Sequence, residues 1–199
     1  MIDIQKINGF HKTAVHNWHD VIERKASDVL WTAIEDNHLQ NFNLWHEEDV
    51  ARRRDVDDAR IVEAKRSIDG FNQARNNAME RIDDWILNFI HQTVGNARSP
   101  VLHSETPGMI IDRLSIMALK EYHMEEQTIR TDVDECHLRT CVERLIILQE
   151  QQRDLTCSLK SLLEELQSGA KSFKVYRQFK MYNDPNLNPQ LYAAKPVSS

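Results

Sequence analysis

Ionisable side chains recur at helical spacing between residues 31 and 64, on the same face as apolar residues whose pattern indicates burial. This face carries two imidazoles, three carboxylates and two guanidiniums, namely His38, His46, Glu35, Asp49, Asp57, Arg53 and Arg60. Burying such groups unpaired costs several kcal/mol each, so they must pair with one another, bind a ligand or metal, or line a solvent-filled cleft. The acids and imidazoles are candidate catalytic or metal-binding groups, and the arginines are candidates for holding an anion.

Two series of these residues recur at intervals of eleven, His38, Asp49 and Arg60 in one and Glu35, His46 and Asp57 in the other. Eleven residues nearly complete three helical turns, so each series stays on one stripe. The pattern favours acids, bases and ligands displayed along a cleft. The alternative is a buried salt-bridge network with a neighbouring helix. That helix offers further candidate ligand-binding residues, which are Asp112, Arg113, Lys120 and His123.

The spacing of Glu35 and His38 is the Glu-x-x-His spacing of di-iron helical bundles. Such a centre needs a second Glu-x-x-His and two further glutamates. The sequence has no second copy, and His123 and Glu126 stand in the reverse order. A divalent metal is therefore one candidate cofactor without a complete motif, and the sequence identifies no cofactor.

Composition bounds the class of protein. With 199 residues, 41% hydrophobic and 28% charged, the chain can form one domain with a core. A net charge of -6 argues against broad nucleic-acid binding, which needs a basic surface, but allows a small anion in a local basic pocket. No run of about 18 apolar residues and no signal-peptide pattern occurs, so we expect a soluble, cytoplasmic protein without membrane insertion. The three cysteines lack zinc-site spacing and fit a reducing compartment.

The elements that position these groups are predicted to be helices throughout, because apolar residues recur at steps of three and four and no stretch alternates convincingly. The expected fold is all-α, an antiparallel bundle of about four to six helices, several of them long. We expect helices over 12–25, from 27 or 28 past 54 with a bend at 55–58 and on to 90, from 106 to about 130, and from 135 to 169. Thr106 followed by Pro107 is a specific helix start signal. Residues 1–169 form the bundle domain.

The longest repeat places nine residues at steps of three and four over four heptads: Leu138, Cys141, Leu145, Leu148, Gln152, Leu155, Leu159, Leu162 and Leu166. Such a seam is typical of a long helix in an antiparallel bundle or at a subunit interface, and we expect a homo-oligomer. Gln152 interrupts the seam and can fix its register.

Residues 170–199 are predicted to form an irregular tail that packs on the bundle or on a partner subunit. Its basic residues alternate with aromatic ones and no acid intervenes before residue 184. Basic groups pair with phosphate or carboxylate and aromatic faces stack on rings, which makes Arg177 and Lys180 candidate ligand-binding residues. The alternative is a strap whose aromatic residues hold it to the bundle while its lysines stay in water.

Four segments together resemble the bacterial domain of unknown function family 4254, which is all-helical. They are residues 41–54 (NFNLWHEEDVARRR), 64–83 (AKRSIDGFNQARNNAMERID), 104–124 (SETPGMIIDRLSIMALKEYHM) and 176–192 (YRQFKMYNDPNLNPQLY). Members of that family tend to be encoded near cell-envelope polysaccharide and glycosyltransferase genes, so the resemblance implies an activated sugar or nucleotide ligand. It supplies no catalytic residues.

Three hypotheses follow. The first is an enzyme or binding protein for a small anionic metabolite, such as a nucleotide or nucleotide sugar. The second is a non-catalytic oligomeric scaffold whose polar network fixes helix register. The third is a helical enzyme similar to chorismate mutase, suggested by residues 110–120 (IIDRLSIMALK) and the many arginines.

Overall fold

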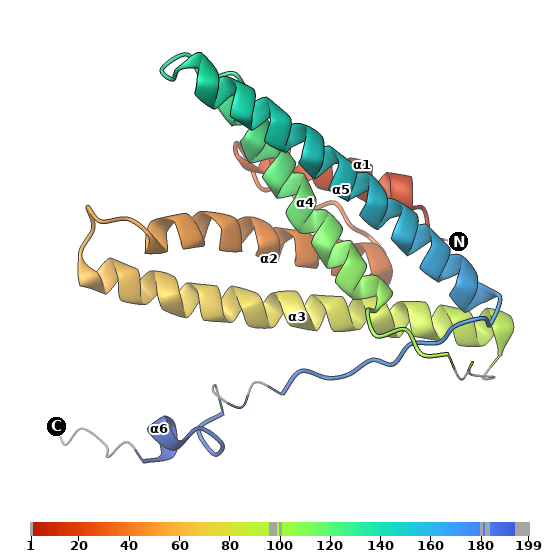
Figure 1. The fold of residues 1–199 in the computed structure, drawn as a ribbon. Helices are drawn as coiled ribbons and strands as arrows, with labels where there is room; N and C mark the ends of the chain where they lie inside the picture. Colours follow the sequence, from red (N-terminus) through yellow and green to blue (C-terminus); the bar gives the residue numbers. More distant parts are fainter. Residues whose placement is uncertain (1, 96–98, 100, 180, 182–183, 194–199) are drawn as a thin grey trace.

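The computed structural model describes residues 2–95, 99, 101–179, 181 and 184–193, and over these residues the fold is all-α, as predicted. Its helices are α1 (Ile4–Trp18), α2 (Val29–Ala51), α3 (Asp58–Val94), α4 (Pro107–Thr128), α5 (Glu135–Gln167) and the short α6 (Pro189–Tyr192). α2 and α3 form one antiparallel pair, α4 and α5 form another, and the two pairs cross (Figure 1). α4 is the central helix, because it contacts α1, α2, α3 and α5.

The structure corrects the expected continuous helix through residues 27–54 and beyond. α2 ends at Ala51, the chain reverses over residues 52–57, and α3 begins at Asp58. Asp57 is the N-cap of α3, since its carboxylate accepts the backbone N–H of Arg60 at 2.9 Å. The two eleven-residue series therefore do not lie on one helix, because Asp57 and Arg60 belong to the antiparallel neighbour.

The first helix also differs from its predicted bounds, since it spans Ile4–Trp18 rather than residues 12–25. Asp3 caps its beginning by accepting the backbone N–H of Lys6 at 3.0 Å. At the other end, the Trp18 indole donates to the carbonyl of Glu23 at 3.2 Å, so the chain folds back immediately after the helix.

The predicted start of α4 is confirmed. Thr106 is its N-cap and Pro107 its first residue. The buried carboxylate of Asp83 on α3 accepts the Thr106 hydroxyl at 2.5 Å and the Gly108 backbone N–H at 2.6 Å. A Cβ on Gly108 would lie 2.7 Å from the carbonyl oxygen of Met79, so glycine permits the close approach of α4 to α3.

The apolar core has two parts. The larger cluster joins residues of α1 to α5 and reaches Phe173 of the tail. The smaller cluster lies where α1, α2 and α4 meet, and consists of Ala14, Val15, Trp18, Phe42, Ala118 and Leu119. This second cluster holds the carboxyl-terminal end of α1 against α2 and α4, which is where the candidate site is formed.

The tail begins as a strap on the bundle. Gly169 ends α5 with a φ of 73°, as its position predicts. Ser172 donates its backbone N–H to Val101 at 2.9 Å, and Phe173 is buried in the core. Arg177 then pairs with Glu80 and Asp84 of α3. None of the described helices is both long and apolar enough to cross a membrane.

Candidate metal centre

A polar network fills the crossing of α2, α3 and α4. Asp112, which is 3% exposed, accepts the side-chain N–H groups of Asn37 at 2.8 Å and Asn41 at 2.9 Å. Arg75 of α3 forms a bidentate ion pair with the same carboxylate, with its Nε at 2.7 Å. The carboxylate is therefore fully paired. A buried polar network was expected at Asp112, but its partners are Arg75 and two asparagines that the sequence pattern did not single out.

His38 continues this network toward α1. Its Nδ1 lies 2.7 Å from Ser115 Oγ and its Nε2 lies 3.1 Å from the carbonyl oxygen of His11. Because a carbonyl can only accept, Nε2 carries the proton and Nδ1 accepts the Ser115 hydroxyl. The pair has the contacts of a serine nucleophile and its base, but both side chains are 0% exposed in this structure.

His11 lies beside His38, with ring centroids 4.6 Å apart. Burial lowers the pKa of His11 to about 3, so its ring is neutral at pH 7. Burial, and then the neighbouring His11, also hold the pKa of His38 well below its ordinary value. Neither ring nitrogen of His11 has a hydrogen-bond partner in the described part of the chain.

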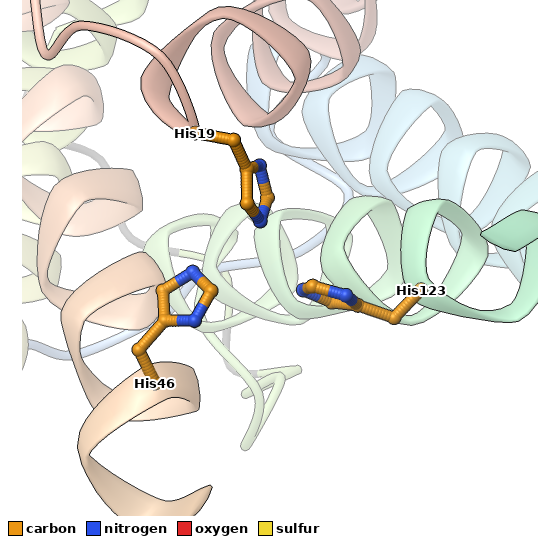
Figure 2. Close-up of side chains that lie close together, drawn as sticks. All are labelled: His19, His46 and His123. Carbon is orange, nitrogen blue, oxygen red and sulfur yellow. The ribbon is translucent and has the colours of Figure 1, made fainter.

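Three other histidines converge at the second core cluster. His19 caps the end of α1, His46 lies on α2, and His123 lies on α4. Their rings point into one shared space, as Figure 2 shows, and one ligand nitrogen from each lies within 4.8 Å of the other two. The sequence singled out His46 and His123 separately. Their meeting, and the participation of His19, depend on how three helices cross.

Hydrogen bonds set the tautomers of two of these rings. His19 Nδ1 donates to the carbonyl of Val15 at 2.7 Å, and His123 Nδ1 donates to Glu126 at 2.8 Å. In each ring Nε2 then carries a lone pair. His123 Nε2 and His46 Nε2 are both buried without a hydrogen-bond partner among the described residues. A carboxylate that orients a histidine through its distal nitrogen is typical of metal-binding histidines.

Aromatic side chains hold the three rings in place. Tyr122 stacks on His19 with centroids 4.5 Å apart and an interplanar angle of 17°. Trp45 stacks on His123 at 4.8 Å and 6°, and Phe42 packs edge-on against His46 at 4.5 Å. These aromatic contacts keep the three imidazoles near one another and limit them to small movements.

The electrostatic surroundings favour a neutral His46. Burial lowers its pKa below the ordinary value, and the neighbouring imidazoles of His19 and His123 lower it further. Asp49 and Glu126 oppose this shift by their negative charge. A neutral imidazole with an unoccupied lone pair is the form that binds a metal ion.

A sequence model of the family described as "Protein of unknown function (DUF4254)" matches residues 31–175. The chain belongs to this family. The DUF4254 match runs from α2 into the tail, so it includes His46, Trp45 and His123, whereas His19 precedes it. No curated protein and no solved structure in the comparisons matches the chain. The family expected from the sequence is therefore confirmed, and the match includes the first three of the four segments but not residues 176–192. The DUF4254 description states no activity.

Of the other predicted residues in this DUF4254 chain, Asp49 alone adjoins the three histidines, being exposed one turn beyond His46. Glu35 is buried but accepts the backbone N–H of Lys25 at 2.7 Å, so it holds the loop between α1 and α2. The remaining predicted residues lie apart from the centre. Arg53 pairs with Asp55, Arg60 with Glu47, Arg113 with Glu105 and Arg177 with Glu80 and Asp84, while Asp57 caps α3 and Lys120 is exposed. Lys180 lies outside the described residues.

Proposed function

We propose that this protein binds a divalent transition metal, with zinc the best fit, through His19, His46 and His123, and uses it to bind or process a small anionic metabolite. The observation that carries the proposal is the convergence of three imidazoles from three helices, two of them with a buried, unpartnered Nε2. Histidine nitrogens are common zinc ligands, and zinc imposes few geometric demands.

The distances support a site that closes around the ion. Zinc lies about 2.0–2.1 Å from histidine nitrogens, which places the nitrogens of a tetrahedral site roughly 3.3 Å apart. The three nitrogens here lie within 4.8 Å of one another. Inward shifts of about 1 Å or less per ring, within the reach of side-chain rotation, would therefore complete the coordination.

The number of ligands supports a functional rather than a purely structural ion. Structural zinc sites have four protein ligands, whereas catalytic sites have three and leave the fourth position to water or substrate. His19 is exposed, so solvent reaches the centre from its side. A zinc ion held by three histidines lowers the pKa of bound water to about 7 and attracts anionic oxygens. Metal-assisted hydrolysis of a small anionic metabolite is the reaction class that this arrangement supports.

The experiment is a zinc titration of the metal-free protein by isothermal titration calorimetry, with bound metal measured by elemental analysis. We expect one zinc per chain, and a loss of binding of at least about a hundredfold in His46→Ala and His123→Ala. His91→Ala is the matched control, because His91 lies near the end of α3 and contacts none of the three rings. Cobalt substitution should give an absorption spectrum of tetrahedral or five-coordinate type. Binding that is equal in all three variants would exclude this site.

A second role has its own supporting observation. The carboxylate of Asp112 is satisfied by Arg75, Asn37 and Asn41 from two other helices. A fully paired buried network can specify the register of the helices that supply its members. We therefore assign the register-fixing role of the second sequence hypothesis to this network, separate from the three histidines.

A further inference from the structure

A cavity of about 380 Å³ lies beside the three histidines, at the crossing of α2, α3 and α4. Its lining includes Trp45, Asp49, Arg52, Asn72, Arg75 and Ile116. Cavities that bind small molecules commonly have volumes of a few hundred Å³, with apolar walls and a few placed polar groups. The size and the mixed lining fit that description.

Two residues belong both to the cavity and to the histidine centre. Trp45 lines the cavity while its indole stacks on the ring of His123. Asp49 also lines the cavity, and its charge raises the pKa of His46. The indole of Trp45 therefore forms a shared wall, which separates a ligand in the cavity from the ring of His123.

The polar groups of the cavity have unused hydrogen-bonding capacity. The carboxamide of Asn72 is half-buried and has no partner among the described residues. Arg75 uses Nε and Nη2 for Asp112, which fixes its guanidinium, and its Nη1 pairs with no described group. Arg52 pairs with Glu48 one turn earlier, but its side chain is 68% exposed. Exposed ion pairs of this type are weak, so an anion can displace Glu48.

These groups define a chemical class of ligand. The Trp45 indole with Ile116 and Leu119 offers flat apolar surface for an aromatic ring. A free carboxamide pairs with the polar edge of such a ring, because it donates and accepts at adjacent atoms. The Arg52 guanidinium suits phosphate or carboxylate, which arginine binds through paired N–H donors, and Nη1 of Arg75 offers a further N–H donor.

We infer that this cavity binds a heteroaromatic ring that carries an anionic group, with the ring on Trp45, its polar edge at Asn72 and the anion at Arg52 and Arg75. That the cavity serves as the substrate pocket of the histidine centre rests on the proposed function. That it binds such a ligand is argued from its lining alone. A nucleoside monophosphate combines the required ring and anion.

The test titrates metal-free protein with AMP and UMP, and with adenosine and ribose 5-phosphate as probes that lack the anion or the ring. We expect at least one nucleotide to bind with one site per chain. Loss of either the ring or the phosphate should weaken binding about tenfold or more, since stacking and bidentate anion contacts each contribute at least that much. Asn72→Ala and Arg52→Ala should each weaken nucleotide binding. Arg54→Ala is the control, because Arg54 is exposed in the same turn and does not line the cavity.

The outcomes separate this inference from the proposed function. Zinc binding without binding of either nucleotide overturns the cavity inference and leaves the metal centre standing. Nucleotide binding that depends on Asn72 and Arg52, in a protein that binds no zinc, supports the cavity and overturns the metal centre. Equal binding by the wild type, Asn72→Ala and Arg52→Ala places the nucleotide elsewhere and overturns the inference.

Discussion

His123 and Glu126 lie one turn apart on α4, and the Nδ1–H of the imidazole donates to the carboxylate at 2.8 Å. The hydrogen bond turns the opposite nitrogen of the ring toward His19 and His46, as Figure 2 shows for the ring orientation. Sequence order alone argued against a metal motif here, because His123 precedes the acid instead of following it. The structure gives the acid a different role, which is to orient the histidine.

The first prediction concerns this orienting contact. Glu126→Gln should weaken zinc binding by about ten- to a hundredfold, because partners of metal-binding histidines fix the tautomer and raise the basicity of the ring. Zinc affinity is measured by competition with a chelator of known affinity. Glu125→Gln is the control, since Glu125 is exposed next to it on the same helix. Equal zinc affinity in the two variants would contradict the orienting role.

The second prediction compares a buried arginine with an exposed one. Arg75→Ala leaves the carboxylate of Asp112 buried without its countercharge, which should lower the free energy of unfolding by about 3–5 kcal/mol. Arg53→Ala removes an exposed pair with Asp55 and should leave stability unchanged within the error of measurement. Urea unfolding at pH 7 measures both variants. A similar loss of stability in both variants would mean that the network around Asp112 does not depend on Arg75.

The third prediction concerns acid stability. His11 has a folded-state pKa of about 3 against an ordinary value of 6.5, so protons bind the unfolded chain first. The stability from this group is present above pH 6.5 and should fall by roughly 1.4 kcal/mol per pH unit down to about pH 3. Urea unfolding at intervals from pH 7 to pH 4 measures the slope. His11→Leu should reduce it, and an unchanged slope in that variant would contradict the assignment.

The carboxyl group of Asp83 changes stability in the opposite direction over an overlapping pH range. Burial raises the pKa of its carboxyl to about 6, against the hydrogen bonds from Thr106 and Gly108 that lower it. Its contribution to stability is therefore present below pH 3.8 and declines as the pH rises to about 6. Asp83→Asn should remove that component, so comparison with His11→Leu separates the two effects.

The fourth prediction uses two glycines within helices. Gly108→Ala places a Cβ 2.7 Å from the Met79 carbonyl oxygen and 2.8 Å from Asp83, so it should destabilise the protein by about 1–3 kcal/mol. Gly70→Ala meets no atom within 4 Å and should stabilise it by up to about 1 kcal/mol, because alanine favours helix. Thermal unfolding followed by circular dichroism gives both signs. A stabilising Gly108→Ala would show that α3 and α4 can move apart at no cost.

The sequence predicts helices and their ends well where the signal is local. Thr106 and Pro107 begin α4, and Gly169 ends α5, because capping depends on neighbouring residues. The reversal at residues 52–57 was expected only as a bend, since a polar turn and a solvated helical turn have similar composition. Asp57 shows the difficulty, because an acid on the helical stripe and an N-cap look the same in sequence.

The candidate site was only partly predictable for a different reason. His46 and His123 stand on predicted helix faces, but a periodic pattern does not state where two helices cross. The position of His19 depends on α1 ending at Trp18, which the sequence placed several residues later. Asn41 lies four residues after Asn37 and three after His38, and this helical spacing is the signal that would have added the asparagines to the polar network.

The place of His19 at the end of α1 gives an ion at the centre a mechanical consequence. It would cross-link α1, α2 and α4, which join it from distant parts of the chain. Because such an ion binds the folded form and not the unfolded chain, it would add stability that rises with the logarithm of the free zinc concentration. Zinc would then hold the carboxyl-terminal end of α1 against α2 and α4, and its removal would weaken that attachment.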